Sequence, residues 1–394
     1  MNTQLDGKVK DIYPRLVDIR RHLHQNPELS FQEYETTDFI KRKLDELGIP
    51  YETPMDTGVI GIIKGKDSRG TDAIALRADI DALPIEEEGD HKREFFSKRP
   101  GAAHCCGHDL HTANLLGAAE LIISSGVSLD YDILLIFQAA EECLPGGGKL
   151  LKETGFLDRW NIKAIYGLHS YPELPPGEIG IRNGPFMARA DEFELTISAE
   201  GGHAAAPHTT VDPIVVGSQW VSEVQTIVSR NVMPAEPAVV TVGYFHGGTA
   251  HNVIPEKVEL MGTIRSFSDD ISYLIHQRLR DICKGYETAT GARMDLNINE
   301  GYPAVLNDEE AVDRIENLAT ELLGASAVHR LTYPVMAGED FAFYLRDYPG
   351  SFFFLGTGSK EANSQYGWHH PRYNVDERAM QTGTVLMAQL ALNG

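Results

Sequence analysis

The sequence is poor in cysteine, in basic residues and in long apolar runs, and each shortage excludes a class of protein. Four cysteines among 394 residues are too few for a framework of disulfide bonds, so we expect a reduced, cytoplasmic protein. The longest apolar run, around DILLIF, is far too short to span a bilayer. The N-terminal stretch MNTQLDGKVKDIYPRL has no apolar core, so we expect no signal peptide. With 35 basic against 57 acidic residues the formal charge is −22, which argues against nucleic acid or a membrane as a partner.

The first half of the chain alternates helical patterns with short apolar runs, which is typical of a sheet of buried parallel strands. Three of these runs lead into acidic or imidazole side chains: AIALRADID into Asp79 and Asp81, DILLIFQAAEE into Glu141 and Glu142, and AIYGLHS into His169. Ligand sites of such sheets lie outside the carboxyl ends of the strands. The pattern therefore predicts an α/β fold and, at one edge of its sheet, a functional site.

The pattern changes after GPFMARA, where strands with alternating polarity begin. The order strand, helix, strand, strand, helix, strand predicts a split βαβ, ferredoxin-like α+β domain. Its first helix is expected to begin at Pro213, with Asp212 as the cap. We expect this domain to be inserted over residues 188–299 between two parts of the first domain, 1–187 and 300–394. Two chain crossings of this kind predict a hinge.

The segment AHCCGHDLHTA concentrates metal-binding residue types around one glycine. Cys106 and His108 flank that glycine, and in an extended segment they would point to the same side. A thiolate and an imidazole so placed suit zinc, nickel or manganese. A small buried cysteine beside surface histidines would explain a lone Cys-Gly-His, but not the accompanying Asp109, His111 and strand-end carboxylates. The constellation therefore favours a metal site.

A catalytic thiol is the second candidate for Cys106. The neighbouring carboxylates of Glu141 and Glu142 oppose a thiolate, and a bound dication would reverse that objection. Metal ligation thus explains both residue types. At a bend from strand to loop both glutamates can face one pocket, where one binds metal and the other takes a proton from water. The later motif GWHHPRYN adds His369 and His370 to the candidate ligands.

The whole chain resembles, motif by motif, the amidohydrolase subfamily of the M20 metallopeptidase superfamily, which includes aminoacylase-like, hippurate-hydrolase-like and auxin-conjugate hydrolases. The motifs follow one another in the family's order: RRHLHQNPELSFQEYET, LRADIDALPI, HCCGHDLHTA, QAAEE, GLHSYPELPPGEIGIRNGPFMA, GGHAAAPH, GGTAHNVIP, GTIRSF, MAGEDFAFY and HHPRYNVDE. Two departures are evident. The family usually has alanine at Cys105, and QAAEE replaces the commoner QPAEE.

The resemblance implies a catalytic α/β domain with a mostly parallel central sheet and an inserted lid and dimerisation domain. It implies two divalent ions per subunit, zinc, manganese or nickel, held by five residues: Cys106, His108, Glu142, His169 and His369. His370 is the rival of His369, which keeps the x-Pro spacing. The resemblance makes Glu141 the general base and gives Asp81 the role of orienting a residue of the metal site.

In the inserted domain, the resemblance implies that His203 reaches a neighbouring subunit's site and stabilises the oxyanion. It associates Asn252 and Arg265 with binding of the substrate carboxylate. The implied reaction is hydrolysis of the amide bond of an N-acyl amino acid, with the lid domain forming a homodimer or a higher homo-oligomer. Two alternatives stay open: a dipeptidase-like metallopeptidase of the same superfamily, and a non-catalytic binding protein that keeps the fold.

Overall fold

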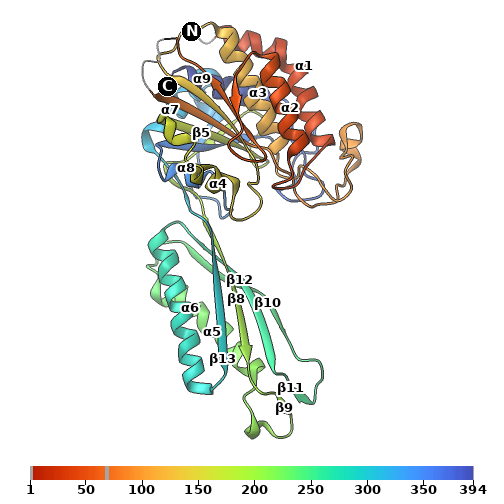
Figure 1. The fold of residues 1–394 in the computed structure, drawn as a ribbon, viewed down its shortest axis with the longest axis vertical. Coiled ribbons are helices and arrows are strands. Elements are labelled where there is room, and N and C mark those ends of the chain that lie inside the picture. The colour runs from red at the N-terminus through yellow and green to blue at the C-terminus, as the bar shows by residue number, and fades with distance from the viewer. Residues whose placement is uncertain (1–2, 67–70, 394) are drawn as a thin grey trace. The chain divides into compact units, whose positions relative to one another are not determined.

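The computed structural model describes residues 3–66 and 71–393, and the chain divides into two compact units (Figure 1). The first unit comprises Met1–Phe186, Leu306–Tyr333 and Asp340–Gly394, and the second comprises Met187–Val305 with Pro334–Glu339. The second unit extends beyond residue 299, the predicted boundary, because its last strand continues to Tyr302. Among the described residues, no helix has the length and apolar character needed to cross a membrane.

The first unit is built on an eight-stranded sheet with the order β1-β2-β4-β3-β5-β16-β6-β15. Its strands are β1 (Tyr51–Glu52), β2 (Val59–Ile63), β3 (Asp72–Asp79), β4 (Asp132–Gln138), β5 (Asn161–Tyr171), β6 (Ile179–Ile181), β15 (Val328–Arg330) and β16 (Gly350–Gly356). The central neighbours β4, β3, β5 and β16 are parallel to one another. Strand β2 runs antiparallel to β4, and β6 runs antiparallel to β16. The predicted α/β fold with a mostly parallel central sheet is therefore confirmed, and the carboxyl ends of its central strands share one edge.

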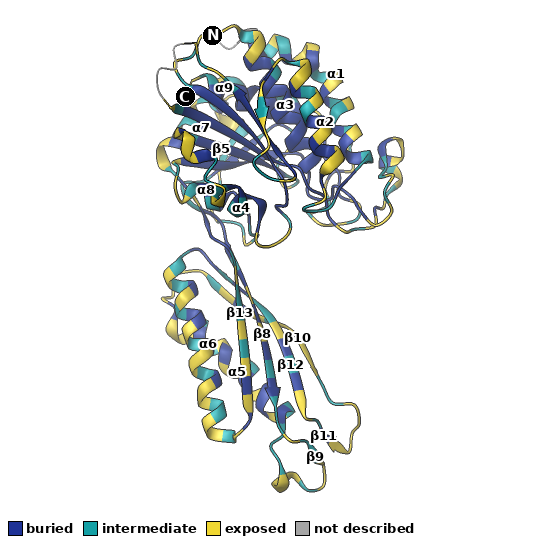
Figure 2. Ribbon diagram, viewed as in Figure 1, coloured by how far each residue is buried: buried dark blue, intermediate teal, exposed yellow. Residues whose placement is uncertain are grey.

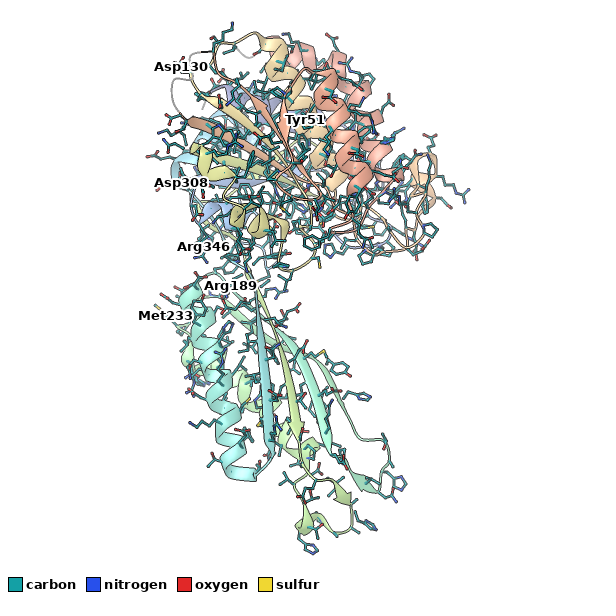
Figure 3. The ribbon with its side chains drawn as sticks, viewed as in Figure 1. Tyr51, Asp130, Arg189, Met233, Asp308 and Arg346 are labelled. Atoms are coloured by element: carbon teal, nitrogen blue, oxygen red, sulfur yellow. The ribbon has the colours of Figure 1, made fainter. Side chains whose placement is uncertain are left out.

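Helices cover this sheet, and its central strands are buried along their length (Figure 2). The helices of this unit are α1 (Thr3–Gln25), α2 (Tyr34–Glu46), α3 (His108–Ser125), α4 (Gly147–Glu153), α7 (Glu309–Leu323), α8 (Ala342–Leu345) and α9 (Ala379–Leu392). Helix α3 packs between α1 and α9 and is buried on nearly every side, as its apolar composition requires. Asp308, labelled in Figure 3, caps α7 by accepting the backbone N–H of Ala311 at 2.9 Å.

The second unit is a four-stranded antiparallel sheet with the order β10-β12-β8-β13, accompanied by two helices. Its main elements are β8 (Arg189–Ser198), α5 (Pro213–Thr226), β10 (Ala238–Gly247), β12 (Lys257–Ser266), α6 (Asp269–Thr290) and β13 (Arg293–Tyr302). This is the predicted α+β element order, and Asp212 caps α5 by accepting the N–H of Ile214 at 2.9 Å. The two helices lie on one face of the sheet, where Trp220 packs against Phe193 in the core.

Short strands complete both units. The chain leaves the first unit through β7 (Gly184–Met187) and returns to it through β14 (Val305–Asn307). Within the second unit, β9 (Gly202–His203) and β11 (Val253–Ile254) pair in an antiparallel two-stranded sheet. At the start of β8 the buried guanidinium of Arg189, labelled in Figure 3, contacts Asp191 at 2.8 Å.

Candidate metal centre

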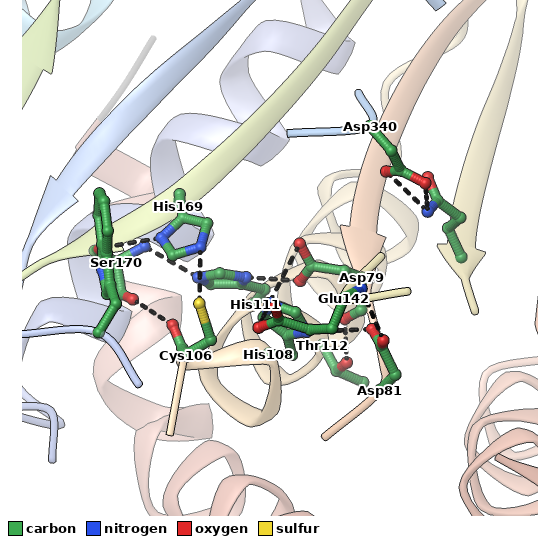
Figure 4. A network of polar contacts seen from close by, with 12 residues as sticks. Asp79, Asp81, Cys106, His108, His111, Thr112, Glu142, His169, Ser170 and Asp340 are labelled. Atoms are coloured by element: carbon green, nitrogen blue, oxygen red, sulfur yellow. Dashed lines mark hydrogen bonds and ion pairs between the residues drawn. The ribbon is translucent and has the colours of Figure 1, made fainter. Parts of the chain in front are cut away.

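The carboxyl ends of three neighbouring strands bring a group of acidic and imidazole side chains together (Figure 4). Strand β3 ends at Asp79, with Asp81 two residues further on. Strand β4 is followed by the loop that carries Glu142, and His169 lies near the end of β5. Because β4, β3 and β5 are adjacent and parallel, these residues meet at one edge of the sheet, as ligand sites do in such folds.

The Cys-Gly-His motif forms a tight turn into helix α3, so the expected extended segment is wrong. Gly107 has φ 99°, in the left-handed region, and His108 is the first residue of the helix. A Cβ at position 107 would lie 2.4 Å from the hydroxyl of Ser170 and 2.9 Å from that of Tyr373. Glycine is therefore required here for both its backbone conformation and its lack of a side chain. The left-handed turn, rather than strand alternation, directs Cys106 and His108 to the same site.

Two groups of potential metal ligands share the thiol of Cys106. The ligand atoms of Cys106, His108 and His169 all lie within 4.8 Å of one another, and so do those of Cys106, Glu142 and His369. The thiol sulfur is 3.3 Å from Nε2 of His169. Oε1 of Glu142 lies 3.3 Å from Nε2 of His369 and 3.8 Å from Nε2 of His108. The structure thus brings together all five residues that the sequence proposed as ligands.

The donor atoms of this cluster fit a transition-metal ion. Within the described part of the chain, Nε2 of His108 and Oε1 of Glu142 are buried and have no hydrogen-bond partner. Buried polar atoms normally have one, so these two donor atoms fit a site that holds a cation. The donor atoms of each group lie within 4.8 Å of one another, close enough for one ion to be bound by all of them. Thiolate, imidazole and carboxylate together suit zinc, nickel or manganese.

Hydrogen bonds to Asp81 and Asp79 orient the two histidines of helix α3. Nδ1 of His108 donates to Asp81 at 3.2 Å, which leaves its Nε2 directed to the donor cluster. Nδ1 of His111 donates to Asp79 at 2.6 Å, and its Nε2 accepts the backbone N–H of Ser170 at 2.8 Å. Both ring nitrogens of His111 are therefore engaged, so it supports the site rather than binding metal.

Protonation of the cluster follows from its burial and its carboxylates. Burial, and then the carboxylates of Glu142 and Glu141, raise the pKa of the Cys106 thiol well above its usual value. Burial lowers the pKa of His169 well below its usual value. Burial by itself would lower the pKa of His108. The facing carboxylates, of which Asp79 has the largest effect, outweigh burial and raise the pKa to about 10. Without a bound cation the thiol stays protonated, which disfavours the alternative of a free catalytic thiolate.

A loop near the C-terminus carries His369 to the cluster. His369 has φ 63°, an uncommon conformation for a residue other than glycine, and its N–H donates to the carbonyl of Cys105 at 2.8 Å. The indole N–H of Trp368 donates to the carbonyl of Ser170 at 2.8 Å, and its ring packs on His169. His370 instead stacks on a tyrosine ring and accepts a backbone N–H of its own loop. This placement favours His369 over His370 as a ligand.

The aspartate of the CGHD motif lies in a separate buried network. Asp109 is 2.8 Å from Nε of Arg20 and 2.8 Å from Nδ1 of His24. The other nitrogen of His24 lies 2.7 Å from Glu87, which also contacts Lys92 at 2.6 Å. Burial raises the pKa of Glu87, but the facing His24 and Lys92 outweigh it and lower the pKa to about 2. This network packs helix α1, which bears the RRHLH motif, against the start of α3.

The remaining predicted residues lie in two places. Glu141 is buried beside the cluster, with its carboxylate within 4.8 Å of the ligand atoms of His108 and Glu142. His203 and Asn252 lie in the second unit: His203 is on β9, and Asn252 directly precedes β11, whose first residue Val253 pairs with His203. Arg265 lies near the end of β12, whereas β11 directly precedes the start of that strand.

Sequence reasoning missed several residues that support the site. Arg77 is fully buried inside β3 and contacts Asp79 at 2.7 Å. A charged residue within an apolar strand was a signal that could have found it, because buried charges are normally paired. Ser170 and Tyr373, whose hydroxyls lie 2.6 Å apart behind Gly107, leave no such signal in the sequence.

Comparisons with known proteins identify the family. The family described as peptidase family M20/M25/M40 matches residues 75–393. N-acetyl-L-cysteine deacetylase of Bacillus subtilis (strain 168) is 44% identical over 367 residues, which is 93% of this chain and 85% of that protein. IAA-amino acid hydrolase ILR1-like 4 of Arabidopsis thaliana is 36% identical over 392 residues, 98% of this chain and 87% of that protein. A solved structure, a dinuclear metal-binding peptidase of the M20 family from Bacillus subtilis, has TM-score 0.83 and 35% identity over 98% of both chains.

The fold and the cluster of cysteine, histidine and glutamate side chains together define a hydrolase with a metal-binding site. The chain belongs to peptidase family M20/M25/M40.

Proposed function

We propose that this protein hydrolyses the amide bond of N-acyl amino acids and related small conjugates, releasing a carboxylic acid and a free amino acid. One observation carries the proposal: the carboxylates of Glu141 and Glu142 lie together with His108 at a group of metal-binding donors. The relatives support the substrate class, since one is a deacetylase of N-acetyl-L-cysteine and another an IAA-amino acid hydrolase.

Two divalent cations, zinc, manganese or nickel, complete the site in this proposal. The two overlapping donor groups support a pair of ions: both groups contain Cys106, which His108 and His169 would join at one ion and Glu142 and His369 at the other. When bound, such ions act as Lewis acids and make water a nucleophile at neutral pH. The four free cysteines of the chain support a reducing compartment, which we take to be the cytoplasm.

Glu141 acts as the general base and then as the general acid. Its carboxylate takes a proton from the attacking water and returns that proton to the leaving nitrogen. The neighbouring Glu142 would be a ligand of a cation, so the two adjacent carboxylates have different tasks. Asp81 accepts hydrogen bonds from His108 and from the backbone N–H of Glu142, at 3.2 Å and 3.0 Å. It therefore orients two ligands at once.

The second unit acts as a lid and as the dimerisation domain in this proposal. The two-stranded sheet of β9 and β11 carries His203, with Asn252 directly before β11, beyond one end of the four-stranded sheet (Figure 1). Arg265 lies eight residues along β12 from Lys257, which corresponds to about 27 Å of strand. One small substrate cannot touch both ends of such a strand. We therefore propose that the protein forms a homodimer in which each active site uses residues of both chains. One chain supplies His203, which stabilises the oxyanion, and Asn252. The chain that holds the metal ligands supplies Arg265, which binds the substrate carboxylate.

The experiment is a screen for released amine over N-acetyl, N-benzoyl and indole-acyl amino acids, with unmodified dipeptides as a separate arm. Each substrate is tested after chelation and again after addition of zinc, manganese or nickel. We expect chelation to abolish amine release and one of the metals to restore it. Release from dipeptides alone would favour the peptidase alternative. No metal-dependent release from any arm would favour a binding protein that keeps the fold.

A further inference from the structure

The loop that bears Glu141 and Glu142 begins with an unusual backbone conformation. Ala140 has φ 54°, in the left-handed region that residues with a side chain rarely adopt. The loop closes on itself, because the N–H of Gly147 donates to the carbonyl of Ala140 at 2.8 Å. Such a conformation persists only where the surroundings hold it, so the contacts of this loop decide where its two glutamates lie.

Three buried carboxyl groups accept backbone N–H groups of this loop and of the first turn of α4, which follows it. Oε1 of Glu33 accepts the N–H of Ala140 at 2.8 Å, at the start of the loop. Asp81 accepts the N–H of Glu142 at 3.0 Å, and Oδ2 of Asp340 accepts the N–H of Gly148 at 2.7 Å, in the first turn of α4, where the loop ends. All three acidic residues have 0% exposure. A buried carboxyl oxygen normally has a hydrogen-bond partner, and here backbone N–H groups supply it.

The two carboxylates at the ends of the loop are themselves held in place. The second oxygen of Glu33 accepts the hydroxyl of Thr57 at 2.9 Å. Asp340 accepts a hydrogen bond from Arg77 at 2.7 Å and from the side chain of Gln138 at 2.8 Å. Arg77 also contacts Asp79, so the end of the loop and the histidines of α3 are joined through one guanidinium.

The contact at the end of the loop depends on a glycine. A Cβ at position 148 would lie 3.0 Å from the carbonyl of Asp340 and 3.1 Å from its Oδ2. Only glycine lets the backbone approach Asp340 this closely without displacement. The glycine-rich stretch after the glutamate pair is thus matched to the aspartate of the later MAGEDFAFY motif.

We infer that Glu33 and Asp340 are positioning residues for the reaction, which act on Glu141 and Glu142 through the backbone N–H groups of Ala140 and Gly148. The inference rests on the proposed function, in which Glu141 is the general base. Loss of either carboxylate releases one end of the loop and moves the base away from its productive position. A displacement of about 1 Å can lower a rate by up to about 100-fold.

Asp132 offers a matched control at the opposite end of the same strand, β4. It is 2% exposed and also accepts a backbone N–H, that of Gly65 at 3.2 Å, together with the side chains of Lys64 and Trp160. Its loss should destabilise the protein as the loss of any buried, hydrogen-bonded carboxylate does. It has no contact with the loop that carries the glutamates.

The test compares Glu33→Ala, Asp340→Ala and Asp132→Ala, each with its amide isostere Gln or Asn, in the full-length, metal-loaded protein. The measurements are kcat and KM, metal content, the urea unfolding midpoint, and amide hydrogen exchange of peptides spanning residues 139–150. We expect the two loop variants to lose about 10- to 100-fold in kcat with metal still bound, and their loop amides to exchange faster. The isosteres should recover part of kcat, because an amide oxygen still accepts the N–H. Asp132→Ala should lose stability but keep kcat and loop protection.

Hydrogen exchange separates this inference from the proposed function. If the wild type releases no amine from any substrate, the proposed function fails, and loop exchange alone then decides the inference. Unchanged loop exchange in Glu33→Ala and Asp340→Ala overturns it. The inference is also overturned if Glu33→Ala and Asp340→Ala lose no more kcat than Asp132→Ala does for the same loss of stability. If the alanine variants do not fold, the Gln and Asn isosteres are compared by the same criteria.

Discussion

The backbone N–H of His369 donates to the carbonyl of Cys105 at 2.8 Å, which ties the HHP motif directly to the CCGH motif. The two residues are far apart in the sequence, yet this bond places the side chain of His369 next to Glu142. It also gives Cys105 a role through its backbone, while its side chain is buried in the core.

The choice between the two histidines of the HHP motif can be tested by metal analysis. We expect His369→Ala to lower metal content or affinity, because His369 lies in a donor group with Cys106 and Glu142. His370→Ala should keep normal metal content, because its ring stacks on Tyr366 instead. Metal per chain is measured after dialysis against a weak chelator. A larger loss in His370→Ala would contradict the assignment.

The adjacent cysteines should respond differently to the same substitution. Cys106→Ser replaces a thiolate ligand by a poorly ionised oxygen, so metal affinity should fall at least about 10-fold. Cys105→Ser buries a hydroxyl in the core, so stability should fall while metal affinity changes little. Chelator competition and urea unfolding of both variants separate the two effects. Equal losses of metal would show that both thiols bind it.

Glu141→Gln keeps the shape of the side chain but removes the proposed base. We expect metal content near the wild-type value and a fall in kcat of at least about 100-fold, the usual size of a general-base contribution. Metal analysis and amine-release kinetics on the same preparation provide the comparison. If the variant loses metal but keeps its activity per bound metal, the roles of Glu141 and Glu142 must be exchanged.

A site shared between two chains predicts complementation. In a mixed dimer of His203→Ala and Glu141→Ala chains, one site has an intact base from the first chain and an intact His203 from the second. At equal mixing about half of the dimers are mixed, so recovered activity should be roughly a quarter of the wild-type value. The measurement is amine release after subunit exchange, verified with differently tagged chains. Exchange without recovery would leave His203 acting within its own chain.

The buried network around Glu87 predicts a pH dependence of stability. Because its pKa in the folded protein is lowered to about 2 from 4.5, its contribution is complete above about pH 4.5 and is lost as the pH falls towards 2. Glu87→Gln should therefore be less stable than wild type by up to about 3 kcal/mol near neutral pH. Urea unfolding at several pH values should show that this difference shrinks below about pH 4.5. Glu46→Gln, on the exposed face of α2, is the control, and a pH-independent difference for Glu87 would contradict the assignment.

Much of the architecture could be predicted from the sequence because hydrophobic periodicity is a local property. The buried runs of β3, β4 and β5, and the strand and helix order of the second unit, each follow from neighbouring residues. The types of candidate ligand could also be predicted locally, because these residues occur in short motifs and directly after predicted strands. The extended Cys-Gly-His segment was wrong, because the close contact of Gly107 with Ser170 and Tyr373 cannot be read from the motif.

What the sequence by itself determined is the order of elements, the fold class and the chemistry of the donor residues. What only the tertiary structure decided is how those donors are held. Arg77 meets Asp340 across 263 positions of sequence, and Glu33 meets Ala140 across 107. The physical reason is that a buried charge needs a partner but does not specify it. The partner is chosen by packing of segments that are distant along the chain, and no local pattern records that choice.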